Sequence, residues 1–136
     1  MERPIENYGD YLVKHHIRPS YARMKILQYL VTEKNHPTVD EIYHTLVKRL
    51  PTLSKTTVYN TLELFKDAKL VKQINIEENT ARYDATVSDH GHFKCQGCGR
   101  IYDFTVDLDG MKAAGLEGFQ IEEKNVYFKG VCPKCL

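Results

Sequence analysis

Residues 84–103 read DATVSDHGHFKCQGCGRIYD, and this stretch decides how the second half of the chain must fold. It holds one C-x-x-C pair, and the same spacing recurs near the end of the chain. Two such pairs are a strong pattern for one tetrahedral zinc ion held by four thiolates. We therefore predict a structural Zn²⁺ site made of Cys95, Cys98, Cys132 and Cys135.

Disulfides and redox-active thiol pairs are the alternatives for these cysteines. Residues 1–5 lack the apolar run of a secretory signal peptide, so we expect a cytoplasmic location. The cytoplasm is reducing and disfavours structural disulfides. A thiol redox switch remains open as an alternative use of the two pairs.

The size of the second half supports the zinc interpretation. The chain after residue 84 amounts to about 50 residues, near the size below which a core rarely holds without metal, disulfides or a partner chain. Zinc binding would therefore supply folding free energy to this half. We expect a second copy of the chain to supply the remainder, in a homodimer.

Composition places the chain among ordinary globular proteins. Of its 136 residues, 42% are hydrophobic and 27% are charged, and the formal net charge is +1. No stretch is apolar enough to span a bilayer, so no membrane partner is expected. A net charge this small means that any contact with nucleic acid must come from a local patch.

The first half shows the pattern of a winged helix-turn-helix. Apolar residues at helical spacing predict helices over 7–16, 20–33, 38–50 and 54–68. Ser20 and Ser54 are suited to N-cap positions, and Thr38 with Glu41 forms a capping box. Strands are expected over 70–76 and 81–84, joined by a turn at 77–80. Helices followed by a two-stranded hairpin are the element order of this DNA-binding fold.

In a winged helix the segment 54–68 would enter the major groove of double-stranded DNA. Its N-terminal part carries side chains that can reach phosphates and base edges. Arg82 and the 77–80 turn would form the wing. The predicted DNA-binding residues are Lys55, Thr56, Tyr59, Asn60 and Arg82. A protein-interaction module with an amphipathic surface helix is the alternative.

The second half is expected to be a small separate domain. Residues 85–89 are short and polar, and we interpret them as a hinge between domains 1–84 and 90–136. Strands are expected over 92–95, 100–105 and 120–131, with one short helix over 107–116. The fold class is α+β: an N-terminal winged helix-turn-helix domain and a small C-terminal α/β dimerisation domain with the structural zinc.

Histidines and aspartates suggest a second metal site. His90 and His92 would point to one face of a strand, and a bend at Gly91 could adjust their approach to an ion. A sulfur-free set of imidazoles and carboxylates suits Fe²⁺, Mn²⁺ or Zn²⁺. One ion held across the hinge would shift the population of domain arrangements. The candidates are His36, Asp84, His90, His92 and Asp103.

The three histidine candidates also have plainer interpretations. His36 before a proline is typical of a surface loop, and His90 and His92 could support the zinc site. Two histidines and a carboxylate with open positions also occur in iron(II) oxygenases. No catalytic base or substrate cavity is evident, so we expect no enzyme.

The assembled pattern resembles the ferric uptake regulator (Fur) family, most closely its peroxide-sensing PerR branch. The motifs that carry the resemblance are HPT at 36–38, TVYNTL at 57–62, RYD at 82–84, DHGH at 89–92, CQGCGRIYDF at 95–104 and VCPKC at 131–135. The resemblance implies a metal-dependent repressor that binds a palindromic operator as a dimer.

The resemblance also implies a regulatory Fe²⁺ or Mn²⁺ site on the five histidine and aspartate candidates. Asp103 stands where iron sensors usually carry Glu, and Asn60 where they often carry Arg; both favour the peroxide branch. Bound iron(II) would react with hydrogen peroxide and oxidise His36 or His90, after which DNA is released. Mn²⁺ would fill the site without this chemistry. An iron- or zinc-sensing Fur-type repressor without peroxide chemistry is the alternative.

Overall fold

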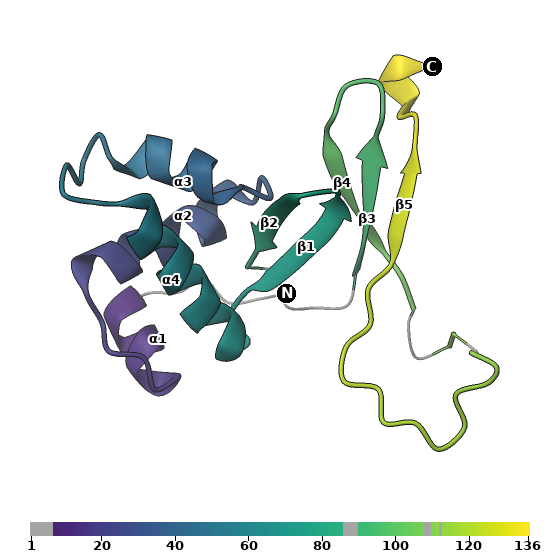
Figure 1. Cartoon of the computed structure of the whole chain (residues 1–136), viewed down its shortest axis with the longest axis horizontal. Helices are drawn as coiled ribbons and strands as arrows, with labels where there is room; N and C mark the ends of the chain where they lie inside the picture. Colours follow the sequence, from purple (N-terminus) through teal and green to yellow (C-terminus); the bar gives the residue numbers. More distant parts are fainter. Residues whose placement is uncertain (1–6, 86–89, 108–109, 112) are drawn as a thin grey trace. The chain divides into compact units, whose positions relative to one another are not determined.

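The structure, a computed structural model of the chain, describes residues 7–85, 90–107, 110–111 and 113–136 (Figure 1). The chain divides into two compact units, Met1–Val87 and Ser88–Leu136. Of the predicted hinge, 86–89 lie outside the described residues. No helix in the described ranges is long and apolar enough to cross a bilayer.

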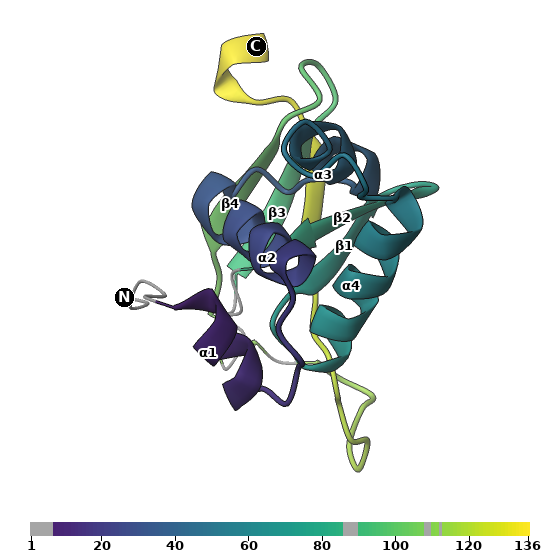
Figure 2. The ribbon, with the colours of Figure 1, turned by 90° about the vertical axis from the view of Figure 1, so that its left-hand side faces the viewer.

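The first unit has the predicted order of helices and hairpin. Four helices are followed by two antiparallel strands, and Figure 2 shows this unit from the helical side. The elements are α1 (Tyr8–Lys14), α2 (Tyr21–Glu33), α3 (Val39–Leu46), α4 (Lys55–Asp67), β1 (Lys72–Glu77) and β2 (Thr80–Asp84). This arrangement confirms the winged helix-turn-helix.

Three helices begin at the predicted caps. The side-chain oxygens of Ser20, Thr38 and Ser54 each accept a backbone N–H three residues on, at 3.2, 3.2 and 3.0 Å. The third helix ends earlier than predicted, at Leu46 instead of residue 50. Residues 47–49 form a turn between the end of the helix and Pro51.

A single apolar core holds the first unit together. Its most buried side chains come from every helix and from the second strand of the hairpin, and include Leu12, Ile26, Leu30, Ile42, Val58, Leu62, Phe65 and Tyr83. The apolar side chains of α4 point into this core, so the opposite face of that helix is exposed.

The second unit contains a three-stranded sheet in the order β4-β3-β5. Its strands are β3 (His90–Cys95), β4 (Ile101–Thr105) and β5 (Tyr127–Gly130), and a 3-10 turn, η1 (Pro133–Cys135), follows. The central strand β3 pairs antiparallel with β4 and parallel with β5. The last strand is much shorter than the predicted 120–131.

The predicted helix over 107–116 is wrong. The described residues of this segment are irregular. Asp107 accepts the N–H of Gly110 at 3.0 Å, and Gly115 has a left-handed φ of 90°. A positive φ is incompatible with right-handed helical backbone.

Gly91 lies inside the regular part of β3 and makes no bend. It faces Phe104 on β4, and a Cβ at this position would lie 2.2 Å from the ring. The ring is itself fixed by stacking on Phe128, with centroids 4.9 Å apart. Glycine is required here because an aromatic ring covers the strand.

Gly91→Ala is expected to destabilise the second unit by about 1–3 kcal/mol, the usual cost of overpacking. Urea unfolding of the zinc-loaded protein, followed by assigned amide signals of β3, measures the loss. In the Gly91→Ala/Phe104→Leu double variant the smaller side chain leaves room for the methyl group. The combined loss is then expected to be less than the sum of the single losses. Simple additivity would contradict the steric explanation.

Candidate metal centres

The sheet register brings the two C-x-x-C pairs together. Cys95 ends β3 opposite Gly130 of β5, so Cys132 follows two residues later beside it. The turn after β3 contains Gly97, where a Cβ would lie 3.0 Å from Cys135. All four sulfur atoms lie within 4.8 Å of one another, as predicted for one metal site.

The spacing of the sulfurs fits zinc. Cys98 Sγ and Cys132 Sγ are 3.8 Å apart, too far for a disulfide. A tetrahedron with Zn–S bonds of about 2.3 Å has sulfur–sulfur edges of about 3.8 Å. The four cysteines are free thiols in the structure. Their geometry therefore suits a closed four-sulfur zinc site.

Hydrogen bonds prepare two of these thiols for ionisation. The pKa of Cys95 is lowered to about 6, first because the N–H of Cys98 donates to its sulfur at 3.4 Å, and then because that of Cys132 donates at 3.3 Å. The pKa of Cys132 is also lowered, chiefly by a hydrogen bond from the Tyr102 hydroxyl. The pKa of Cys135 is raised to about 12 by its hydrogen bonds to Cys132 and Cys95. Four thiolates therefore need a cation among them.

The sequence interpretation missed Tyr102. Its hydrogen bond to Cys132, followed by burial, raises the pKa of the phenol to about 12. It lies on β4 opposite Phe93, next to the first cysteine pair. The sequence contains no signal for this role, because the contact depends on strand pairing.

A first histidine–aspartate pair lies in the winged-helix unit. His36 is in the loop between α2 and α3, and Asp84 ends β2. The N–H of Tyr83 donates to the carbonyl of Pro37 at 3.0 Å, which fastens this strand to the loop. The His36 Nε2 and Asp84 Oδ2 atoms are 3.9 Å apart as a result.

A second cluster lies on the sheet of the other unit. His90 and His92 share one face of β3, as predicted, with ring centroids 4.5 Å apart. Asp103 on β4 is the direct strand partner of His92. Its Oδ1 atom lies 3.9 Å from His90 Nε2 and 3.4 Å from His92 Nε2. Both clusters lack sulfur and offer the imidazoles and carboxylates that Fe²⁺, Mn²⁺ and Zn²⁺ accept.

The exposed face of α4 carries the residues predicted to contact DNA. Lys55, Thr56, Tyr59 and Asn60 are all exposed, and Tyr59 is 51% accessible. The Lys55 ammonium lies 3.2 Å from Asp40 in an exposed ion pair. Arg82 differs from these, because its guanidinium bonds to groups of its own domain.

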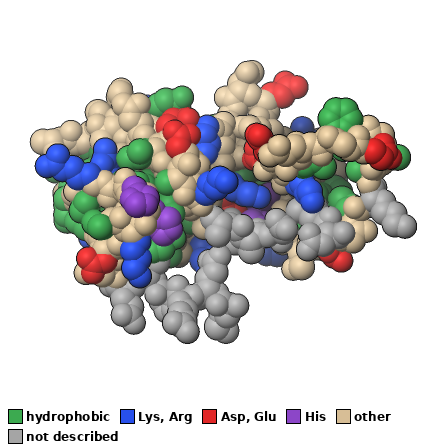
Figure 3. Space-filling model, turned by 90° about the horizontal axis from the view of Figure 1, so that it is seen from below, with side chains coloured by type: hydrophobic (Ala, Val, Ile, Leu, Met, Phe, Trp, Pro, Cys, Tyr) green, Lys and Arg blue, Asp and Glu red, His purple; other side chains and the backbone are tan. Residues whose placement is uncertain are grey.

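A hollow beside α4 was not anticipated from the sequence. It has a volume of about 400 Å³ and is bordered by Arg18, Ser20 and Arg23 as well as by Thr57 and Asn60. Across the face in Figure 3, basic and acidic side chains are interspersed, in keeping with a net charge of +1. Arg18 and Arg23 therefore place two positive charges locally beside α4.

A winged-helix unit with an exposed polar helix, together with a sheet unit that carries a four-cysteine site, defines a class of metal-responsive transcription regulators. Sequence comparison makes the assignment specific. The family model of the ferric uptake regulator family matches residues 14–129, and the chain belongs to this family.

Similar proteins include two with names that refer to peroxide. The "Peroxide operon regulator" of Bacillus subtilis is 38% identical over 122 residues, which cover 88% of this chain and 84% of that protein. The "Peroxide-responsive repressor PerR" of Staphylococcus epidermidis is 35% identical, with coverage of 99% and 92%.

Solved structures support the same fold. The ferric uptake regulator of Vibrio cholerae has a TM-score of 0.75 and 25% identity, and covers 93% of this chain and 100% of its own. PerR from Streptococcus pyogenes has a TM-score of 0.53 and 32% identity, with coverage of 93% and 89%.

Cys95→Ser is expected to abolish zinc binding and unfold the second unit. Structural zinc contributes on the order of 10 kcal/mol, more than so small a sheet can replace. Elemental analysis measures zinc per chain, and assigned amide signals report each unit separately. His44→Ala, which removes an exposed histidine of α3, is the control and is expected to retain zinc. A native sheet with no zinc would contradict this prediction.

Proposed function

We propose that this protein is a metal-dependent, peroxide-responsive transcriptional repressor that binds palindromic operator DNA as a homodimer. The observation that carries this proposal is the pair of sulfur-free histidine–aspartate clusters in a chain similar to named peroxide regulators. Such ligands favour Fe²⁺ or Mn²⁺, whereas the separate four-cysteine site suits structural Zn²⁺.

The proposed regulatory site combines both clusters around one Fe²⁺ or Mn²⁺ ion. Ligand number supports this: the first cluster offers one imidazole and one carboxylate, too few for stable coordination alone. Two aspartates would also balance the charge of a divalent ion. The proposed ligands are His36, Asp84, His90, His92 and Asp103. Binding across 85–89 would favour one arrangement of the two units over others.

Bound iron(II) would supply the one-electron chemistry that converts hydrogen peroxide into a strong oxidant at the site. His36 and His90 are the proposed targets of oxidation. An imidazole that gains oxygen becomes a poorer base and a poorer ligand. The ion would then be lost, together with the unit arrangement that binds DNA. The zinc-bound cysteines would have no free thiol partner and would remain structural.

The proposed DNA contacts begin with the exposed residues of α4, namely Lys55, Thr56, Tyr59 and Asn60. The amide of Asn60 can pair with an adenine edge in the major groove. Arg18 and Arg23 border the hollow beside this helix and are suited to the phosphates that flank the groove.

The proposed dimer is supported by the second unit. Phe119, Ile121, Phe128 and Val131 are exposed there, and exposed apolar groups of this size are typical of an interaction surface. A second copy would cover these side chains and present two recognition helices to two half-sites.

An iron- or zinc-sensing Fur-type repressor is the second candidate. Its support is the fold similarity to the Vibrio cholerae ferric uptake regulator. The two candidates share the metal sites and DNA binding, and differ in the fate of the ligand histidines.

Anaerobic loading with Fe²⁺ followed by equimolar hydrogen peroxide is expected to add one oxygen to the peptides that hold His36 or His90. Peptide mass spectrometry locates the added mass, and a gel shift with operator DNA measures release. Protein loaded with Mn²⁺ is the matched control. It is expected to gain no oxygen and to stay bound to operator DNA.

Intact histidines with metal-dependent DNA binding would assign the protein to the metal-sensing alternative. Binding of DNA that ignores both metal and chelator would contradict the proposed function as a whole.

Asn60→Ala and Arg23→Ala are expected to weaken DNA binding in different ways. Asn60→Ala loses a base contact, at a cost of about 1–3 kcal/mol on the cognate operator and little on other sequences. Arg23→Ala loses a phosphate contact, so it weakens binding to all sequences. The salt slope, that is the steepness with which the logarithm of the affinity falls with the logarithm of the salt concentration, is expected to be lower by about 1. Salt-dependent fluorescence anisotropy on operator and scrambled duplexes measures both. Identical behaviour of the two variants would contradict the assignment.

A further inference from the structure

We propose that Arg82 is a positioning residue that fastens the His36 half of the regulatory metal site to the wing. The inference rests on the proposed function, because it treats His36 as a metal ligand. It replaces the prediction from sequence that Arg82 contacts DNA.

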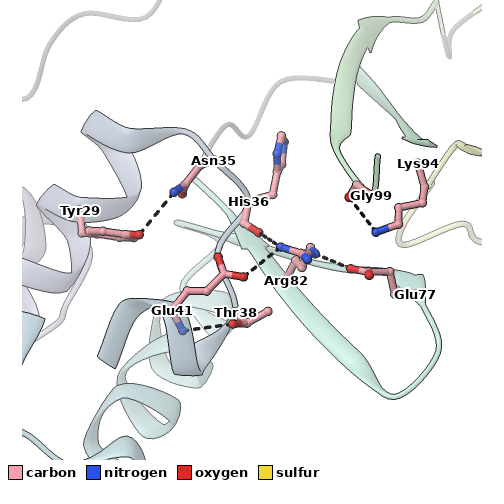
Figure 4. Close-up of polar contacts among 9 residues, drawn as sticks. All are labelled: Tyr29, Asn35, His36, Thr38, Glu41, Glu77, Arg82, Lys94 and Gly99. Atoms are coloured by element: carbon pink, nitrogen blue, oxygen red, sulfur yellow. Dashed lines mark hydrogen bonds and ion pairs between the residues drawn. The ribbon is translucent and has the colours of Figure 1, made fainter. Parts of the chain in front are cut away.

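The Arg82 guanidinium joins three separate segments of the winged-helix unit. Nη1 donates to the His36 carbonyl at 3.0 Å, and also lies 3.5 Å from the Glu41 carboxylate on α3. Nε donates to Glu77 at the end of β1, beside the wing turn. Figure 4 shows the His36 carbonyl turned toward the guanidinium, whereas its imidazole points away. Arg82 therefore holds the backbone of His36 and does not bond to its ring.

A backbone contact strengthens the same junction. The N–H of Tyr83 donates to the Pro37 carbonyl at 3.0 Å. Residues 82 and 84 lie on one face of β2, because side chains alternate along a strand. Arg82 and Asp84 therefore both face the loop, where Arg82 holds His36 and Asp84 lies 3.9 Å from its ring.

The loop needs such support because its backbone is unfavourable. His36 has a φ of 53° and Lys34 has a φ of 48°, both in the left-handed region. Residues other than glycine adopt this region at a cost, and the residue before a proline prefers an extended backbone. Without the Arg82 bond, the His36 carbonyl would be free to turn toward that extended conformation and move the ring away from Asp84. The bond thus preorganises a ligand that the local sequence would place elsewhere.

Both the shape and the charge of arginine matter here. Its planar group has donors on three nitrogens in fixed directions and can serve a carbonyl and two carboxylates at once, whereas a lysine has all its donors on one nitrogen. Glu41 and Glu77 offset the positive charge, so the guanidinium does not oppose a nearby metal cation. With a side chain only 19% accessible and directed at these partners, Arg82 is poorly placed for a phosphate.

Arg82→Lys tests this role because it keeps the charge that a phosphate contact needs and loses the three-way bridge. Direct titration of zinc-loaded protein with Mn²⁺ is expected to show affinity weaker by about 10–100-fold, the usual effect of losing a residue that orients a metal ligand. Zinc content is expected to stay unchanged. Hydrogen exchange of the Tyr83 amide, measured without Mn²⁺, is expected to become faster, because this amide bonds to the Pro37 carbonyl in the same loop. Arg49→Lys, at an exposed arginine after α3, is the control and is expected to match the wild type.

DNA binding separates positioning from phosphate contact. With Arg82→Lys, more Mn²⁺ is expected to be needed for operator binding, while affinity at saturating Mn²⁺ and its salt slope match the wild type. If Arg82→Ala instead loses affinity at saturating Mn²⁺ with a salt slope lower by about 1, Arg82 contacts phosphate and the inference is overturned. Unchanged Mn²⁺ affinity and Tyr83 exchange in Arg82→Lys would overturn it as well.

Two further measurements distinguish a failure of the Arg82 bridge from a failure of the proposed metal role of His36. Glu41→Gln removes one partner of the bridge and is expected to shift Mn²⁺ affinity in the same direction by a smaller factor, which provides a test should the arginine variants fail to fold. If His36→Ala binds Mn²⁺ as tightly as the wild type, the proposed metal role of His36 fails. Faster Tyr83 exchange in Arg82→Lys would then still support the bridge itself.

Discussion

The mutual repulsion of four thiolates is the constraint on which the second unit depends. Their sulfur atoms lie within 4.8 Å of one another, and each ionisation makes the next less favourable until a cation compensates. Apart from Cys95 and Cys132, no apolar side chain in the described part of this unit is buried. Metal binding would therefore take the place of a hydrophobic core and fix the ends of the strands that meet at the cysteines.

The first unit is stabilised differently and can support a different kind of site. A packed apolar core fixes α4 and the hairpin, so the loop between α2 and α3 can adopt an unfavourable backbone. Bonds from Arg82 and Tyr83 hold that loop against β2. This loop would supply His36 to the proposed regulatory metal, whereas the closed cysteine site suits a permanent ion.

Local sequence signals predicted the structure well wherever they act within a few residues. Ser20, Thr38 and Ser54 cap their helices because a side-chain oxygen reaches an N–H three residues on. Two predictions failed for different reasons. The segment over 107–116 has helical spacing, but Gly115 within it has a φ of 90°, which is a local effect. Gly91 suggested a bend, yet its reason is the Phe104 ring on the neighbouring strand.

The sequence by itself determined the ligand types, their grouping into sulfur and sulfur-free sets, and the order of helices and hairpin. These follow from residue types and their spacing, which can be read from the sequence without knowledge of the fold. Only the tertiary structure decided that Tyr102 bonds to Cys132, that Arg18 and Arg23 border α4, and that Arg82 faces inward. Each of these depends on strand register or helix packing, and such contacts join residues whose proximity no local pattern encodes.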